Sequence, residues 1–216
     1  KLRAPVEPGA PGFFFSVIFG IILAAIIGFL IGLVLSKFSG DYYALGSFGF
    51  NIIVYSIFLN WQSLTRGPLG IPGIGRPELF GIDFTSNLNF LILVIVFAVI
   101  VYFIAKFLVN SSFGRVLKAI REDEQAIKVF GYNTLYFKLV IFVIGASMAA
   151  LAGSFFASYI SYIDPSSFAL TESIFILAII ILGGLANNKG VVFGAIFLVL
   201  LPELLRFVGF SSDIAA

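Results

Sequence analysis

The chain has 216 residues, 60% of them hydrophobic and 11% charged, with a net charge of +2 and neither cysteine nor histidine. Soluble domains are about 45–50% apolar and about 25% charged, so the composition excludes a soluble domain and indicates an integral membrane protein with several spans. The missing residue types exclude disulfides, Cys/His metal sites and thiol or histidine catalysis within the chain. The small net charge argues against nucleic-acid binding.

Six apolar stretches predict membrane segments, since about 20 helical residues cross a hydrocarbon core of about 30 Å. They are Phe13–Leu35, Tyr42–Trp61, Leu88–Leu108, Phe137–Tyr162, Phe168–Leu185 and Val191–Phe210. The fold class expected is therefore all-α, a polytopic transmembrane helical bundle. The second stretch contains glycines and asparagines, which favour an inner or partly unwound helix.

Small residues spaced four apart predict close helix packing on two of these stretches. On the first stretch they are Ala24, Gly28 and Gly32, and on the fourth they form a longer ridge of Gly145, Ala149, Gly153 and Ala157.

Two polar regions separate the spans. Gln62–Asn87 is rich in glycine and proline, which forbid a regular helix. Gly114–Lys138 carries eight charged residues between strongly apolar neighbours. Placing Gly114–Lys138 in the cytoplasm puts more Lys and Arg on the inner side of the membrane, as the positive-inside rule favours. The Gly/Pro-rich region and the Asp164-Pro165 turn then lie outside.

The charged region Gly114–Lys138 predicts a short amphipathic helix at the membrane surface. Ser111 or Ser112 is expected to cap its start, Gly131 its end, and Asn133-Thr134 the start of the next span. Glu124 and Lys128 are spaced to form an i,i+4 pair. The apolar face would consist of Val116, Ile120, Ile127 and Phe130. A plain solvated loop is the alternative, but the length and mixed charge favour docking to a partner protein.

Three blocks carry a resemblance to a known family. FGRVLKAIREDEQAIKVFGYNTLYFKLVIFVIGASMAALAG resembles the cytoplasmic signature of permeases of the branched-chain amino-acid ABC importer family. GDYYALGSFGF with NWQSLTRGPLGIPGI, and the region beginning DPSSFALTESIF, resemble other parts of the M-type subunit. The resemblance runs from about Leu35 to near the end of the chain. It implies a single permease domain over residues 1–216, with a cytoplasmic coupling loop at residues 111–136. It also implies further spans before and after, so we expect the sequence to be a portion of a longer chain.

Permeases of ABC importers carry an EAA-x3-G element that docks on the ATP-binding subunit. The matching residues here are Gln125, Ala126, Ile127 and Gly131, so the glycine and one alanine are kept while the acid is replaced. Glu124, one residue earlier, is a substitute for the acid. The resemblance thus implies these ATPase-docking residues: Arg115, Lys118, Arg121, Glu122, Glu124, Gln125, Ala126 and Gly131.

The function implied is that of a membrane-spanning subunit of an ATP-driven importer in a bacterial or archaeal plasma membrane, which forms the path for branched-chain amino acids and is not itself an enzyme. The expected partners are ATP-binding subunits that hold ATP-Mg, a second permease subunit, an external substrate-binding protein and membrane lipid, with no cofactor or metal on this chain. Polar residues on the spans are candidates for lining the path: Asn51, Ser56, Ser147, Ser154 and Ser158. The alternative for each is a polar group satisfied within its own helix or by a neighbour.

Other functions stay open. A related permease for urea or short amides fits the same residues, and a non-transport membrane scaffold is a further alternative. An aspartyl enzyme using Asp41 and Asp164 is disfavoured, because the expected topology puts the two carboxyl groups on opposite sides of the membrane.

Overall fold

The structure, a computed structural model, describes residues 12–38, 40–79 and 82–207. Its long helices are α1 (Gly12–Leu35), α2 (Asp41–Asn60), α4 (Asn87–Asn110), α7 (Thr134–Ile160), α8 (Leu170–Gly183) and α9 (Asn188–Phe207). The shorter elements are α3 (Gln62–Thr65), α5 (Ser112–Glu122), α6 (Glu124–Val129), the 3-10 helices η1 (Gly67–Leu69) and η2 (Pro165–Phe168), and the strands β1 (Ile71–Pro72), β2 (Glu78–Leu79), β3 (Ile82–Asp83) and β4 (Tyr162–Ile163).

Five helical segments in the described part of the chain are long and apolar enough to cross a membrane. They are α1, α2, α4, α7 and the segment Pro165–Gly183, which joins η2 to α8. A sixth, Asn188–Pro202 in α9, is apolar but shorter. The predicted all-α, multi-span fold is confirmed, although the last predicted segment ends in residues 208–210, outside the described part. The chain divides into two units, residues 1–167 and 168–216.

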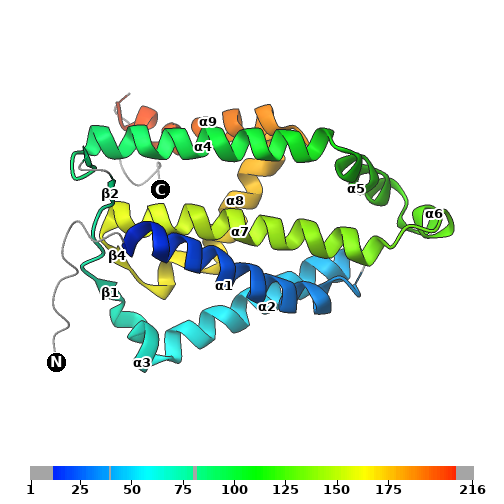
Figure 1. The fold of residues 1–216 in the computed structure, drawn as a ribbon, viewed down its shortest axis with the longest axis horizontal. Helices are drawn as coiled ribbons and strands as arrows, with labels where there is room; N and C mark the ends of the chain where they lie inside the picture. Colours follow the sequence, from blue (N-terminus) through cyan, green and yellow to red (C-terminus); the bar gives the residue numbers. More distant parts are fainter. Residues whose placement is uncertain (1–11, 39, 80–81, 208–216) are drawn as a thin grey trace. The chain divides into compact units, whose positions relative to one another are not determined.

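In the first unit, α1 packs along α7 (Figure 1). A Cβ atom added at Gly28 would lie 2.9 Å from Cβ of Ala146, and one at Gly32 would lie 2.9 Å from Cδ1 of Leu139. Since positions later in α1 meet positions earlier in α7, the two helices are antiparallel. The predicted small face of α1 is therefore confirmed at these two glycines, which let the backbones approach closely.

The predicted ridge on α7 is wrong as a continuous packing surface within the described residues, although its last member, Ala157, is buried. An added Cβ at Gly145 or Gly153 meets no atom within 4 Å, and Ala149 is exposed. The spacing identified small residues correctly, but α1 packs on the face of α7 that carries Ala146.

The prediction for α2 is also wrong within the described residues. The helix is regular from Asp41 to Asn60, and no residue of its span is buried. Its internal glycines and asparagines therefore neither unwind it nor place it inside this part of the fold.

Large aromatic side chains fill the space between α4 and α7. Phe90 and Leu93 of α4 form a buried cluster with Phe84 and with Phe155 of α7, and the rings of Phe97 and Phe155 lie 5.0 Å apart. These bulky side chains hold the two helices farther apart than the glycines hold α1 and α7.

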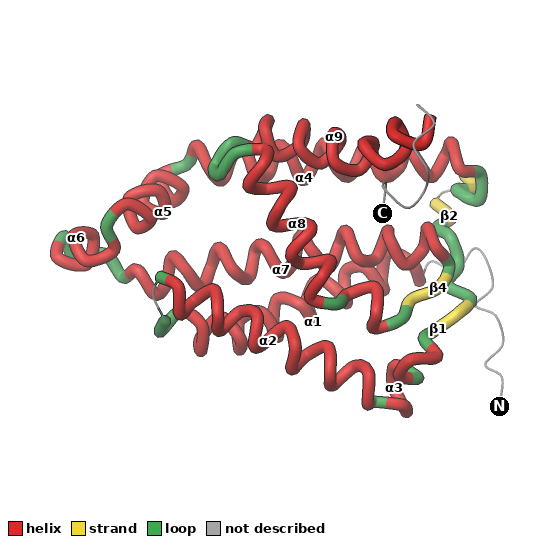
Figure 2. The backbone as a smooth tube through the Cα atoms, turned by 180° about the vertical axis from the view of Figure 1, so that it is seen from behind, coloured by secondary structure: helices red, strands yellow, loops and turns green. Residues whose placement is uncertain are grey.

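The two polar regions lie at opposite ends of the first unit (Figures 1 and 2). At one end β1 pairs with β4 in antiparallel register, with Ile71 opposite Ile163 and Pro72 opposite Tyr162. Gly70 has a φ of +60°, and an added Cβ would meet the carbonyl oxygen of Ile163, so only glycine fits this turn. The other end, where α4 leads into α7, carries α5 and α6. The Gly/Pro-rich region and the Asp164-Pro165 turn thus share one end, as predicted, although the strand pairing was not foreseen.

The second unit is a helical hairpin of α8 and α9. An added Cβ at Gly190 would overlap the carbonyl group of Gly183, so the helices touch at their glycines. The Asn187 side chain accepts a hydrogen bond from the Gly190 amide at 3.2 Å and caps α9. Helix α8 lies within the predicted segment Phe168–Leu185 and ends at Gly183.

We predict that Gly28→Ala lowers the stability of the detergent-solubilised protein by about 1–3 kcal/mol, the usual effect of an extra methyl group in a packed contact. The short Ala146 side chain cannot swing aside, so α1 and α7 must separate. Thermal unfolding of the isolated chain measures the effect, and Gly145→Ala is the matched control because its Cβ meets open space. Equal melting temperatures for the two variants would contradict the α1–α7 packing.

Candidate functional site

The candidate site is the coupling loop, residues 111–136, which joins α4 to α7. Its first turn is set by Ser111 and Gly114. The Ser111 hydroxyl accepts a hydrogen bond from the Gly114 amide at 3.2 Å and donates one to the Leu108 carbonyl oxygen at 2.6 Å. A Cβ at Gly114 would overlap the carbonyl oxygens of Leu108 and Val109. The predicted cap is thus confirmed at Ser111, and the sharp turn from α4 into α5 requires glycine at position 114.

Helix α5 is amphipathic and packs against α4 and α7. Ile120 is buried and Val116 is half-buried, while the basic side chains of Arg115, Lys118 and Arg121 are exposed. Arg121 forms an ion pair with Glu122 in which both side chains face solvent. The predicted division into an apolar face and a charged face is therefore confirmed for α5.

The predicted single helix is wrong, because the chain breaks at Asp123. This residue has extended backbone angles, and its carboxylate accepts hydrogen bonds from the amides of Gln125 at 2.9 Å and Ala126 at 3.0 Å. An aspartate that caps the next turn offers the backbone an alternative to continuing the first helix. The coupling loop therefore holds two short helices, and Phe130 leaves the apolar face on which the uninterrupted helix would have placed it.

Helix α6 ends in a Schellman motif around Gly131. The Tyr132 amide donates to the Ile127 carbonyl oxygen at 3.3 Å, and the Gly131 amide donates to that of Lys128 at 3.0 Å. Gly131 has a φ of +85°, which glycine adopts without strain. Asn133 then caps α7 by accepting from the Tyr136 amide at 3.2 Å. The predicted caps at Gly131 and Asn133 are confirmed.

An apolar tip, Val129 and Phe130, was missed by the sequence analysis. The two side chains are 87% and 77% exposed, which makes Val129 the most exposed large apolar residue in the described part of the chain. They lie outside the spanning helices, so lipid around the spans does not by itself account for their exposure. The sequence signal for this tip was that Val129 and Phe130 come directly before the capping Gly131 and after the helix-breaking Asp123.

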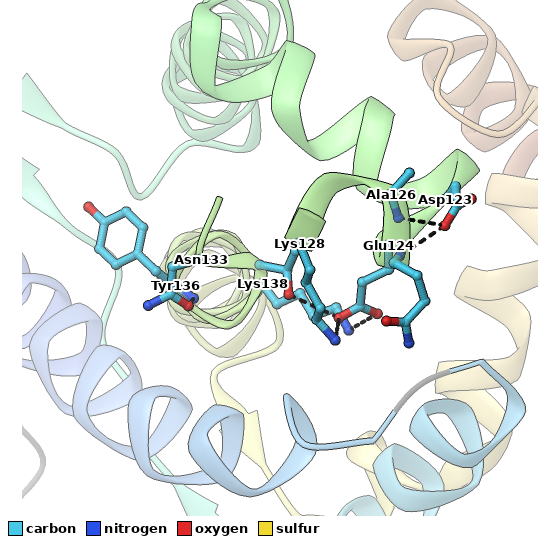
Figure 3. Close-up of polar contacts among 9 residues, drawn as sticks. Asp123, Glu124, Ala126, Lys128, Asn133, Tyr136 and Lys138 are labelled. Atoms are coloured by element: carbon cyan, nitrogen blue, oxygen red, sulfur yellow. Dashed lines mark hydrogen bonds and ion pairs between the residues drawn. The ribbon is translucent and has the colours of Figure 1, made fainter. Parts of the chain in front are cut away.

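Glu124 is turned toward α7 (Figure 3). One carboxylate oxygen contacts Lys138 Nζ at 2.6 Å, and the other contacts Lys128 Nζ at 3.1 Å and accepts a hydrogen bond from the Thr134 hydroxyl at 3.0 Å. The side chains of Glu124 and Lys138 are only 20% and 18% exposed. The predicted Glu124–Lys128 pair is confirmed, while the contacts with Thr134 and Lys138 were not foreseen.

These contacts also set the charge of Glu124. Partial burial raises the pKa of its carboxyl group, but hydrogen bonds from Lys138, Lys128 and Thr134 outweigh that effect, and the pKa lies below its usual value. Because its pKa is lowered in the folded protein, the Glu124 carboxylate stabilises the fold at any pH above the ordinary pKa of a glutamate. This stabilisation is lost as the pH falls through the lowered pKa. The carboxylate is therefore ionised at neutral pH.

The structure leaves most of the predicted docking residues exposed on α5, on α6 and in the turn that follows α6. The exposed ones are Arg115, Lys118, Arg121, Glu122, Gln125 and Gly131, whereas Ala126 is half-buried. Glu124 is engaged within the chain instead. Their role in docking stays a prediction.

The candidate path residues lie on two helices, Asn51 and Ser56 on α2 and the three serines on α7. The hydroxyls of Ser147 and Ser154 donate to the carbonyl oxygens four residues earlier, each at 2.9 Å. Ser154 also lies against α1 near Gly20, and Ser158 is 1% exposed. The structure thus favours the satisfied-hydroxyl alternative for Ser147 and Ser154, and the lining role of the set stays a prediction.

Comparison with known proteins agrees with this architecture. Residues 4–215 match the family described as the permease component of branched-chain amino acid transport systems. The chain belongs to this permease family. Its helices and its family together make it a multi-pass membrane protein. No solved structure matches the chain.

Three relatives illustrate the permease's place in the family. It is 35% identical over 86% of its length to the high-affinity branched-chain amino acid transport system permease protein LivM of Escherichia coli K12. It is 30% identical over 92% of its length to the probable LivM of Methanocaldococcus jannaschii, and 27% identical over 91% to the autoinducer 2 import system permease protein LsrC of Escherichia coli O9:H4. The chain covers 49%, 59% and 58% of these relatives, so it spans about half the length of the curated proteins it matches.

We predict that Asp123→Ala destabilises α6 by about 0.5–2 kcal/mol, because the amides of Gln125 and Ala126 lose their acceptor. Hydrogen exchange measured by mass spectrometry should speed up in the peptide that covers α6 and stay unchanged in α4. Asp123→Asn keeps an accepting oxygen and should behave as the parent. Unchanged exchange in the alanine variant would show that the carboxylate does not hold the break between α5 and α6.

Proposed function

We propose that the chain is part of the membrane-spanning permease subunit of an ABC importer for branched-chain amino acids. The observation that carries the proposal is the family match over residues 4–215, together with LivM relatives from a bacterium and an archaeon. The same relatives support a location in the plasma membrane. Hydrolysis of ATP-Mg takes place on separate ATP-binding subunits.

The coupling loop is the docking surface for an ATP-binding subunit. The apolar tip, Val129 and Phe130, forms the centre of the contact, and the exposed charged side chains of α5 form part of its polar rim. Protein interfaces combine a buried apolar centre with a polar rim, and large apolar anchors contribute most of their binding energy. The high exposure of both tip residues supports this arrangement.

Transport follows from a shift between two arrangements of packed helices. When ATP closes the partner subunits, they displace α5 and α6, and the spans continuous with the coupling loop move with them. The substrate path lies between this subunit and a second permease subunit. The region around β1 and β4, at the opposite end of the first unit, receives the external substrate-binding protein.

The substrate assignment rests on the relatives. Both LivM proteins are more similar to this chain than the LsrC protein is. Urea and short amides remain the alternative considered from sequence, and none of the relatives described above is named for them.

Uptake by the full-length protein tests the function. The protein is purified from its native host with its co-purifying subunits, reconstituted into liposomes and supplied with ATP, the external binding protein and radiolabelled leucine. We expect ATP-dependent leucine accumulation that excess isoleucine or valine suppresses and excess urea does not. Accumulation that only urea suppresses would change the assigned substrate from branched-chain amino acids to urea. The absence of any ATP-binding subunit from the purified complex would reject the importer assignment.

We predict that Phe130→Asp releases the ATP-binding subunit, because a charge at the centre of an apolar contact is desolvated without a partner. Retention of the subunit on the tagged, full-length permease measures the effect. Leu69→Asp is the matched control, since Leu69 is 80% exposed but belongs to η1 at the other end of the first unit. Full retention in the Phe130 variant would show that the apolar tip contacts something else, such as lipid.

A further inference from the structure

Glu124 joins α6 to α7 through side chains that lie on both sides of the turn at Gly131. Of its three partners, Lys128 belongs to α6, whereas Thr134 and Lys138 belong to α7. The contact with Lys128 is therefore internal to one helix, and only the other two connect the helices. Lys138 makes the shorter of the two lysine contacts, 2.6 Å compared with 3.1 Å.

The backbone between α6 and α7 is poorly suited to transmit force by itself. Four residues connect the helices, and Gly131 among them has a left-handed conformation with no atom within 4 Å of an added Cβ. Gly131 is where a hinge would form in this turn, since glycine has the largest range of allowed backbone angles. A side-chain connection across this turn limits that motion.

The surroundings of Glu124 make this connection stronger than a surface ion pair. Thr134 is buried, and Glu124 and Lys138 are about four-fifths shielded from water. Shielded charges interact more strongly and are less screened by salt. Removing Lys138 would take away the closer of the two cations that compensate the shielded carboxylate of Glu124. The Arg121–Glu122 pair on α5, by contrast, is exposed on both sides.

The connection continues into the membrane-spanning part. Leu139, the residue after Lys138, is buried and packs against Gly32 of α1. The first two turns of α7 thus contact Glu124 through Lys138 and contact α1 through Leu139.

We propose that the Glu124–Lys138 ion pair is a coupling element: it makes α6 and the start of α7 move as one body, so that displacement of the docking surface reaches the α1–α7 pair. The proposal rests on the importer function proposed above. Glu124 acts here as a positioning residue that holds the docking helix on the span, and not as a contact to the ATP-binding subunit.

Two lysine variants separate this role from docking. Lys138→Gln removes the charged partner on α7 and leaves only the Thr134 hydrogen bond between the helices. The matched control Lys128→Gln removes the partner on α6 and leaves both contacts between the helices. In the full-length complex we expect Lys138→Gln to retain the ATP-binding subunit and its basal ATP hydrolysis. It should reduce leucine uptake per ATP hydrolysed by about five-fold or more, which corresponds to the lower range of coupling between sites. Lys128→Gln should match the parent, and Lys138→Arg should restore uptake because arginine also pairs with carboxylates.

A distance measurement reads the rigid connection directly. The 216 residues contain no cysteine, so spin labels can be placed at Gln125→Cys on α6 and Tyr136→Cys on α7 once any cysteine elsewhere in the full-length protein is replaced. Because Gln125 is also a predicted docking residue, the labelled protein is used only if it retains the ATP-binding subunit as the parent does. Labelled protein is mixed with an excess of unlabelled protein before assembly, so that the measured distance is the one within a single permease chain. We expect one narrow distance that nucleotide does not change in the parent and in Lys128→Gln. In Lys138→Gln the distance should broaden or shift with ATP.

The outcomes distinguish the two proposals. A nucleotide-dependent distance in the parent, or full uptake by Lys138→Gln with an unchanged distance, would overturn the coupling role and leave the importer function standing. A parent complex without ATP-driven uptake would reject the importer function, while a narrow parent distance lost in Lys138→Gln would still support the rigid connection.

Discussion

The close antiparallel contact of α1 with α7 is the constraint on which the arrangement of the first unit depends. Helices surrounded by lipid gain little from burying apolar surface against each other, so their association relies on close van der Waals packing. Gly28 and Gly32 provide the necessary space, since side chains there would collide with Ala146 and Leu139 of α7. Once α7 is held in this way, its first two turns provide a fixed base for the coupling loop.

The charged residues of the coupling loop divide into two groups with different physical roles. Arg121 and Glu122 are exposed, so their pair contributes little to stability and can exchange partners at small cost. Glu124 is shielded and saturated by three partners, so breaking its contacts would leave buried charge uncompensated. The exposed group is suited to meeting another protein, and the shielded group is suited to holding α6 in place. The EAA-x3-G element implied that Glu124 belongs to the docking surface, so the motif did not predict this division.

Local features of the fold were predictable from sequence. The spans α1, α4 and α7 lie within a few residues of their predicted bounds, because the length of an apolar run directly reflects the thickness that it must cross. The caps at Ser111, Gly131 and Asn133 were predictable because each depends on hydrogen bonds within a few residues. The break at Asp123 depends on an equally local bond, but the apolar spacing around it suggested one continuous helix.

Features that depend on distant residues were not predictable in this way. The small-residue pattern on α7 identified residues that permit close approach, yet only the position of α1 decides that Ala146 is used and Gly145 is not. The pairing of β1 with β4 and the ion pair of Glu124 with Lys138 likewise join residues of separate elements, so no pattern within one helix or strand predicts them. Lys138 was counted as one more charge at the edge of the coupling loop, although it lies inside the first turns of α7. A charge that begins a span is shielded on one side by its helix neighbours, and an acid fourteen residues earlier is close enough to neutralise it. The pairing of Lys138 with Glu124 therefore follows from the need to compensate a shielded charge, and the turn at Gly131 is the local feature that brings the two groups together.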